Sequence, residues 1–185
     1  MPRVLLGVSS SISAYKAVDI ANYLTGMDCE VDTIVTKNAT KLVAPLTIQT
    51  LTKRKVYVDM FDESFYPDVR HISLAQACDL CLIAPATANV IGKLANGIAD
   101  DMLTTVIMAV PKSTPKYIAP AMNTNMYLNS IVQENIEKLK SHGYLFIGPK
   151  EGRLACDDVG VGALESASKI VEIVGGVLGV SRKSN

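Results

Sequence analysis

The sequence predicts an α/β fold in which helices cover both faces of a parallel sheet, which makes a three-layer sandwich. Short apolar runs rich in β-branched residues recur along the chain and alternate with segments of helical periodicity. The short runs are apolar at nearly every position, a pattern typical of strands that are buried on both faces. Strands of this kind, each separated from the next by a helix, favour a parallel sheet over an antiparallel one.

The first unit of this pattern is a strand over 3–8, a Ser-rich turn, and a helix over 13–24. The alternation continues to the end of the chain and predicts a Rossmann-like or flavodoxin-like sheet, with further strands at 30–35, 79–84, 116–119 and 144–147 and helices at 41–51, 88–94, 102–109, 130–141 and 165–174. Long loops are expected at 59–69, 119–129 and 148–162. Such loops are more often functional than decorative in a compact domain.

Length and composition indicate one packed domain. The 185 residues fit a single core, expected over 1–175, and the Gly-, Ser- and Lys-rich residues 176–185 are expected to fray. Lys plus Arg equals Asp plus Glu at 18 each, so no broad basic surface favours nucleic acid. No apolar stretch reaches the ~18 residues that span a bilayer, and the N-terminal run is too short for a signal peptide. We therefore expect a cytoplasmic protein that binds neither nucleic acid nor membrane.

Four cysteines are present, and in a reducing compartment an even number does not imply disulfides. Cys78 and Cys81 have a spacing that suggests zinc or redox chemistry. Cys81, however, lies inside an apolar strand, and no second pair of ligands accompanies the two cysteines. Burial is the favoured interpretation, and no metal site is predicted.

Two polar turns follow predicted strands. Ser9, Ser10, Ser11 and Ile12 stand where the first strand meets its helix, a place where backbone N–H groups and hydroxyls favour phosphate. The turn is neither a GxGxxG fingerprint nor a P-loop, and a Ser-rich turn is by itself an ordinary helix cap. In the second turn, 84–89, Thr87 and Asn89 can cap a helix or face a ligand.

Three further segments carry candidate reactive groups. Asn123 can donate its amide NH2 to a carboxylate while its carbonyl accepts from the backbone, although a polar loop with core methionines would look the same. His71 is the best candidate base, because His142 at a helix C-terminus is explained by the helix dipole. Cys156, in a Gly-rich loop that also holds Arg153, can act as a proton donor.

Together these segments resemble the homo-oligomeric flavin-containing cysteine decarboxylases over roughly residues 3–170. The resemblance is carried by His71, by PATAN at 85–89, by PAMNTNMY at 120–127 and by RLACDDVGVGA at 153–163. Two residues depart from the family pattern. Tyr127 replaces the usual Trp, which keeps an aromatic wall, and Ser10 replaces the usual Gly of the first turn.

The resemblance implies FMN as the cofactor and 4'-phosphopantothenoylcysteine as the substrate, converted to 4'-phosphopantetheine in coenzyme A biosynthesis. It implies His71 as base and Cys156 as acid, and substrate binding by Asn123, Arg153, Met126 and Ala155. The flavin site that it implies consists of Ser9, Ser10, Ser11, Ile12, Thr36, Lys37, Thr87, Ala88, Asn89, Val90 and Ala121. A homotrimer or homododecamer and a separate phosphopantothenoylcysteine synthetase are expected as well.

Other functions remain open on the sequence. A relative that oxidatively decarboxylates a peptide's C-terminal cysteine would not need the proton donor Cys156. A non-catalytic flavin-binding regulatory protein would be expected to carry a long acidic tail. A flavodoxin-type electron carrier would need neither His71 nor Asn123, and a prenylated-flavin synthase would not be expected to combine the PAMN and RLAC segments.

Overall fold

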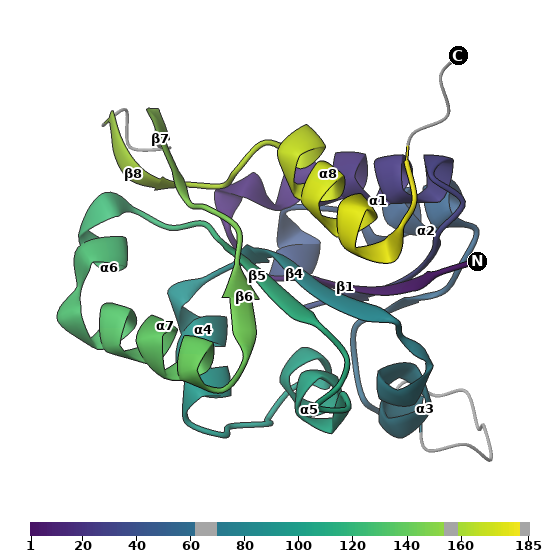
Figure 1. Ribbon diagram of the computed structural model, residues 1–185, viewed down its shortest axis with the longest axis horizontal. Helices are drawn as coiled ribbons and strands as arrows, with labels where there is room; N and C mark the ends of the chain where they lie inside the picture. Colours follow the sequence, from purple (N-terminus) through teal and green to yellow (C-terminus); the bar gives the residue numbers. More distant parts are fainter. Residues whose placement is uncertain (62–69, 154–158, 182–185) are drawn as a thin grey trace.

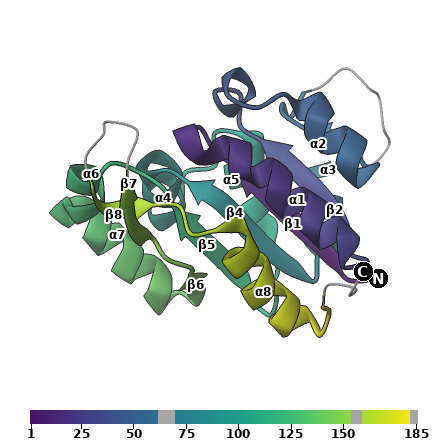
Figure 2. The same cartoon turned by 90° about the horizontal axis from the view of Figure 1, so that it is seen from above.

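The computed structural model describes residues 1–61, 70–153 and 159–181 and has helices on both faces of a six-stranded sheet (Figures 1 and 2). This confirms the predicted three-layer sandwich. The strand order is β3-β2-β1-β4-β5-β6, and every neighbouring pair is parallel. This is the order of a doubly wound sheet, in which the direction of winding reverses between β1 and β4. Ligands of such sheets bind at the carboxyl ends of the strands beside that reversal.

The elements follow the predicted alternation. The strands of the sheet are β1 (Arg3–Val8), β2 (Glu30–Val35), β3 (Val56–Tyr57), β4 (Leu80–Ala86), β5 (Lys116–Pro120) and β6 (Tyr144–Phe146). One face is covered by α1 (Lys16–Gly26), α2 (Pro45–Thr52) and α8 (Ala167–Leu178) (Figure 2). The other face is covered by α3 (Arg70–Ala77), α4 (Ala88–Ala95), α5 (Met102–Ala109) and α7 (Ser130–Ser141) (Figure 1). Among the described helices, none is both long and apolar enough to cross a membrane.

Side chains of the central strands contribute to two hydrophobic cores, one between the sheet and each helical layer. In β1, Val4 and Leu6 belong to the core beneath α1 and α8, whereas Leu5 belongs to the core above α5 and α7. All three are fully buried, and each such side chain contributes about 1.5–3 kcal/mol on burial. This explains why the strands are apolar at consecutive positions. Cys81 in β4 is buried in the same way, as predicted.

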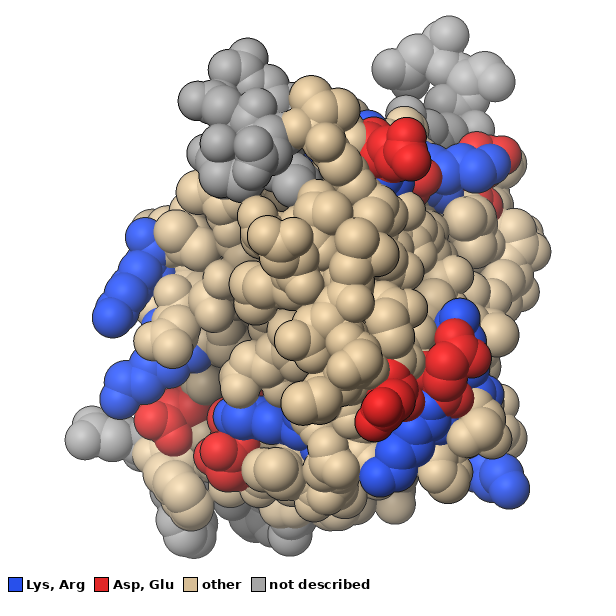
Figure 3. Space-filling view, turned by 90° about the vertical axis from the view of Figure 1, so that its left-hand side faces the viewer, with Lys and Arg blue, Asp and Glu red and all other residues tan. Residues whose placement is uncertain are grey.

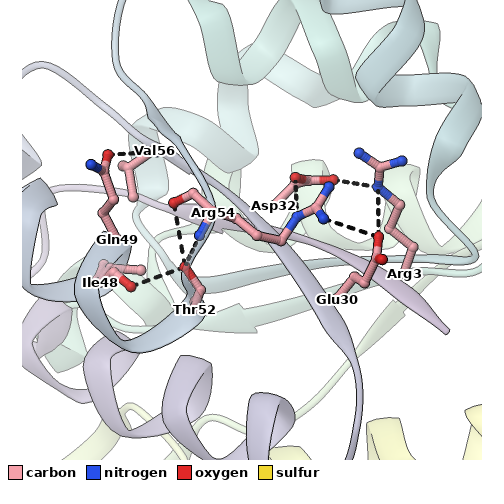
Figure 4. A network of polar contacts seen from close by, with 8 residues as sticks. All are labelled: Arg3, Glu30, Asp32, Ile48, Gln49, Thr52, Arg54 and Val56. Carbon is pink, nitrogen blue, oxygen red and sulfur yellow. Dashed lines mark hydrogen bonds and ion pairs between the residues drawn. The ribbon is translucent and has the colours of Figure 1, made fainter. Parts of the chain in front are cut away.

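A buried carboxylate ties the amino ends of the strands together (Figure 4). Asp32 of β2 is 4% exposed and accepts hydrogen bonds from the Nε atoms of Arg3 in β1 and Arg54 before β3. Arg54 also pairs with Glu30 at 3.1 Å. A buried carboxylate needs such partners, since an unpaired one would carry a large desolvation cost. A network of four charged residues therefore lies at the amino edge of the sheet.

Some boundaries differ from the predicted ones. The helix expected from residue 41 begins at Pro45, where the proline ring suits the first helical position, and a 3-10 turn, η2 (Ala39–Lys41), precedes it. Strand β3 has two residues and was not predicted. At the C-terminus α8 runs to Leu178, and Gly175 within it is buried where a Cβ would overlap the Met27 side chain. The helix thus extends past residue 176, where the frayed tail was expected to begin.

Two of the predicted loops contain regular structure. The segment 119–129 includes the short helix α6 (Thr124–Leu128). The segment 148–162 contains an antiparallel pair, β7 (Lys150–Arg153) and β8 (Val159–Ala163), which packs against α6. Of the third predicted loop, 59–69, residues 62–69 lie outside the described part of the chain.

Candidate active site

A cavity of about 550 Å³ opens at the carboxyl ends of β1, β4 and β5. Three of the segments predicted to carry function, the Ser-rich turn, the PATAN turn and the PAMN loop, meet there, together with the end of β8. The cavity is lined by Ser10, Ser11, Ile12, Ser13, Tyr15, Lys16, Thr87, Ala121, Met122, Asn123, Met126, Gly162, Ala163 and Leu164. It therefore lies where a doubly wound sheet binds its ligands.

Ser9 joins the two turns that follow β1 and β4. Its N–H and its hydroxyl both donate to the Pro85 carbonyl, at 3.2 and 2.8 Å, and its Oγ accepts from the Thr87 N–H at 3.0 Å. The residue is 1% exposed and does not line the cavity. Ser10 and Ser11 line the cavity instead, and Ser11 also caps the 3-10 turn η1 (Ile12–Tyr15).

Thr87 has both of the roles considered for the PATAN turn. It is the N-cap of α4, with Oγ1 accepting from the Val90 N–H at 3.4 Å, and it also lines the cavity. Ala88, Asn89 and Val90 form the first turn of α4 but are not among the lining residues. Val90 is buried in the core. Ala121 lines the cavity, and its N–H donates a hydrogen bond to the Ala86 carbonyl.

Asn123 is held in a defined orientation at the cavity wall. It is the N-cap of α6, and its Oδ1 accepts from the Asn125 N–H at 2.8 Å. The carbonyl thus accepts from backbone, as the sequence indicated, and the NH2 group is the donor end of this side chain. Met126 also lines the cavity. Tyr127 is not among the lining residues, and its partly buried side chain packs against the core above α5 and α7.

The hairpin closes the cavity through glycines that allow close backbone approach. The Gly162 carbonyl accepts from the Met122 N–H at 2.9 Å, its φ is +136°, and a Cβ there would overlap the Met122 carbonyl. A Cβ on Gly160 would overlap Thr124 Oγ1. Arg153 ends β7, whereas Ala155 and Cys156 lie outside the described residues.

Lys16 lines the cavity and was not predicted, although it follows the Ser-rich turn by one helical turn. Burial lowers the pKa of its ammonium, the nearby Lys150 lowers the pKa further, and Glu165 partly opposes both effects. The lining thus combines serine hydroxyls and the Lys16 ammonium with apolar side chains such as Ile12 and Met126. This donor set suits a flat apolar ring that carries an anionic tail.

Thr36 and Lys37, also predicted to bind flavin, follow β2 and do not line the cavity. The Thr36 N–H donates to the Val8 carbonyl at 2.9 Å, and Lys37 is exposed. Thr36 Oγ1 is buried without a hydrogen bond to any described residue. Such an atom is expected to have a partner, so a ligand hydrogen bond at this strand end fits the structure.

His71 is not brought to the cavity of its own chain. It is the second residue of α3 and is absent from the lining residues. Both ribbon views place α3 at the opposite end of the molecule from α6 and the β7–β8 hairpin (Figures 1 and 2). The structure therefore unites Asn123 with the two turns but leaves the candidate base elsewhere.

The fold is that of an α/β protein with its ligand site at the reversal point of the sheet. The cavity lining suits a cofactor that carries a ring and a phosphate group. The Flavoprotein family model matches residues 1–179, so the chain belongs to that family. A probable phosphopantothenoylcysteine decarboxylase of Streptococcus mutans is 46% identical over 170 residues, which cover 92% of this chain and 95% of that protein.

Further relatives include longer proteins and solved structures. The coenzyme A biosynthesis bifunctional protein CoaBC of Bacillus subtilis is 49% identical over 92% of this chain, but the match spans only 42% of that protein. A PPC decarboxylase variant complexed with pantothenoylaminoethenethiol superposes with a TM-score of 0.86 at 33% identity, covering 96% of this chain and 98% of that one. The FMN binding protein AtHal3 superposes with a TM-score of 0.83 at 32% sequence identity, covering 100% of this chain and 99% of that one.

Proposed function

We propose that this chain is an FMN-dependent decarboxylase that converts 4'-phosphopantothenoylcysteine to 4'-phosphopantetheine and CO2 in coenzyme A biosynthesis. The observation that carries the proposal is the cavity at the reversal point of the sheet, where Asn123 presents an oriented amide beside a Ser-rich turn. Relatives whose names state this activity or its pathway match nearly the whole chain.

The residues that hold FMN in this proposal come from the strand ends. Ser10 and Ser11 supply hydroxyls for its phosphate, and Ile12, Thr87 and Ala121 surround the rest of the group. Thr36, Lys37 and the first turn of α4 flank the same edge of the sheet. Bound FMN supplies the electron sink that a cysteine carboxylate lacks.

The protein's own groups bind the substrate and move its protons. The NH2 of Asn123 holds the substrate carboxylate, with Met126 beside it. His71 accepts the thiol proton, and Cys156 returns a proton to the carbon that has lost CO2. Arg153 and Ala155 are the further residues proposed to bind the substrate. The net conversion replaces a carboxylate with a proton and consumes no external oxidant.

A homo-oligomer accounts for the position of His71. If His71 acts on the substrate, it must enter the cavity of a neighbouring copy, because its own cavity lies at the far end of the fold. Charged residues on the end of the molecule that carries α6 and the hairpin stand mainly around the margin (Figure 3). The exposed apolar side chains of these elements and of the start of α7 are Met126, Leu128, Ile131 and Val159. They support a homo-oligomer, for which a homotrimer and a homododecamer are the two candidates.

A synthetase activity that makes the substrate is expected to act in the same pathway as this chain. The chain spans 42% of the Bacillus bifunctional relative, which leaves the remainder of that protein for a second activity.

Cys29, Cys78 and Cys81 are buried free thiols, which supports a reducing cytoplasmic setting.

Turnover by the purified protein tests the proposal. The preparation should bind FMN, become yellow, and release one CO2 for each 4'-phosphopantetheine formed from 4'-phosphopantothenoylcysteine. A protein that takes up no FMN, or that binds FMN but leaves the substrate unchanged, would contradict it. A peptide ending in cysteine serves as the comparison substrate and should be consumed poorly.

Variants of the two proton-transferring residues divide the reaction. Cys156→Ser should keep FMN and release CO2 but fail to form 4'-phosphopantetheine, because only the final protonation is lost. His71→Asn should keep FMN yet show no bleaching of the flavin by substrate in anaerobic mixing. Normal 4'-phosphopantetheine formation by Cys156→Ser, or bleaching at the wild-type rate by His71→Asn, would remove that residue from its role.

A further inference from the structure

We propose that Lys16 supplies the cation that binds a phosphomonoester at the active cavity, and that it thereby favours phosphorylated ligands. The inference rests on the proposed function and deepens it by naming the side chain that binds the phosphate. It concerns a residue that the motifs of the sequence did not single out. Two ligands of the proposed reaction carry this chemistry, the substrate and FMN.

The backbone around Lys16 is fixed by packing, so its side chain starts from a defined place. Lys16 begins α1 directly after η1, and two nearby residues, Ala14 two positions before it and Ala17 directly after it, are both 0% exposed. Lys16 lines the cavity together with Ser11 and Ser13, which precede it by one turn or slightly more. The ammonium and the two hydroxyls therefore belong to one wall.

Lys16 is the one charged residue among the described residues that line the cavity. Within the described part of the chain its ammonium makes no hydrogen bond or ion pair. The charges that act on it most are Lys150 of β7 and Glu165, and the Glu165 carboxylate already accepts the Ser166 N–H at 2.7 Å. Among the described residues, these two ammonium groups against one carboxylate give a net positive charge around Lys16.

A bound dianion would stabilise this arrangement. Burial and Lys150 both lower the pKa of Lys16, which means that they disfavour the charged form of its ammonium. A phosphomonoester carries about −1.5 to −2 charges and three acceptor oxygens at neutral pH. It would offset the repulsion between the ammonium groups and accept from Lys16 and from the Ser11 and Ser13 hydroxyls. A single carboxylate offers less charge and fewer acceptors, and Asn123 already provides for one.

Matched variants and paired ligands test the inference. Lys16→Gln removes the charge, Lys16→Arg keeps it, and Lys112→Gln removes an exposed charge outside the cavity lining as a control. In the first arm KM is measured for 4'-phosphopantothenoylcysteine and for pantothenoylcysteine, which lacks the phosphate. In the second arm the flavin-free protein is titrated with FMN and with riboflavin, and flavin fluorescence gives Kd without any turnover.

If Lys16 reads the substrate phosphate, Lys16→Gln should raise KM for the phosphorylated substrate by about 10- to 100-fold, the effect of one lost charge-assisted hydrogen bond. Pantothenoylcysteine and FMN should be affected less than about twofold, Lys16→Arg should recover most of the loss, and Lys112→Gln should match the wild type. If the phosphate of FMN is the one bound, the selective loss should appear instead in FMN affinity and spare riboflavin.

Two results would overturn the inference: no change in either arm, or equal losses for the phosphorylated and unphosphorylated member of each pair, which would indicate a general structural role. Failure of the wild-type protein to consume either substrate would count against the proposed function alone. In that case Kd of the two cysteine conjugates, measured by equilibrium binding, would replace KM in the first arm, and the FMN and riboflavin titration would stand unchanged.

Discussion

At the scale of single residues, Asp101 shows how one side chain fixes a helix end beside the sheet. It caps α5 through a capping box, with Oδ1 accepting from the Thr104 N–H at 2.8 Å, and its Oδ2 accepts from Lys93 Nζ at 3.0 Å. Burial would raise the pKa of Asp101, but the bonds from Thr104 and Lys93 outweigh burial and lower the pKa below its usual value. The carboxylate is therefore more stable in the folded chain than in the unfolded one.

We predict that Asp101→Ala lowers the free energy of unfolding by about 1 kcal/mol at pH 7, the usual loss for an N-cap. A carboxyl group whose pKa is lowered by folding stabilises the protein above its unfolded pKa and loses that contribution as the pH falls through the folded pKa. The difference in free energy of unfolding between wild type and Asp101→Ala, measured by urea unfolding, should therefore become smaller toward pH 3.

Asp101→Asn is the matched control, because asparagine keeps the capping oxygen and loses only the charge. It should lose less stability than Asp101→Ala at pH 7. A stability difference between wild type and Asp101→Ala that stays constant from pH 7 to pH 3 would contradict the contribution of the charge.

At the scale of elements, the β7–β8 hairpin depends on its contact with α6. Gly160 faces Thr124 so closely that a Cβ would overlap the threonine side chain, whose buried Oγ1 has no hydrogen bond to a described residue. We predict that Gly160→Ala lowers the free energy of unfolding by about 1–3 kcal/mol, as overpacking usually does. It should also raise KM for the substrate, because β8 lines the cavity. Urea unfolding and steady-state kinetics measure the two effects.

Gly152 provides the control for this contact, because it pairs with Gly160 across the hairpin but has room for a Cβ at 3.5 Å from Ala163. Gly152→Ala should leave stability and KM nearly unchanged. Adding Thr124→Ala to Gly160→Ala removes the overlapping oxygen and should restore most of the loss. If the double variant is as impaired as Gly160→Ala alone, the overlap with Thr124 is not the cause.

The elements that the sequence predicted well are those whose signal is local. Strands such as β1 and β4 are apolar because both faces are buried, so their pattern survives without tertiary information. The hairpin could not be predicted in this way, since β7 and β8 consist largely of glycine and charged or exposed residues. Their pairing is stabilised by docking on α6, a long-range contact that short-range periodicity does not contain.

At the scale of the whole molecule, part of the candidate site followed from the sequence and part did not. The turns at the ends of β1 and β4 meet because parallel strands bring their carboxyl ends to one edge, which the alternation of strands and helices already implied. Lys16 was missed because it sits within an ordinary amphipathic helix. The distance of His71 from Asn123 was missed because the motifs indicate chemistry and do not indicate which copy of the chain supplies each group.

The proposed sharing of the site between copies predicts complementation. His71→Asn and Asn123→Asp should each be nearly inactive alone, the second because its carboxylate repels the substrate carboxylate. When the two variants are co-expressed and form mixed oligomers, an interface that takes His71 from one copy and Asn123 from the other is intact. Random pairing makes roughly a quarter of the interfaces of a symmetric assembly intact, so about a quarter of wild-type turnover should return.

Two controls separate shared sites from simple mixing of inactive proteins. Oligomers of the two variants purified separately and combined without subunit exchange should stay inactive, whereas exchange should restore turnover. A double variant that carries both substitutions on one chain, co-expressed with wild type, should leave about a quarter of the interfaces intact if sites are shared and about half if each chain builds its own. The second value, together with absence of complementation, would place His71 and Asn123 in the same subunit and require α3 to move toward the cavity.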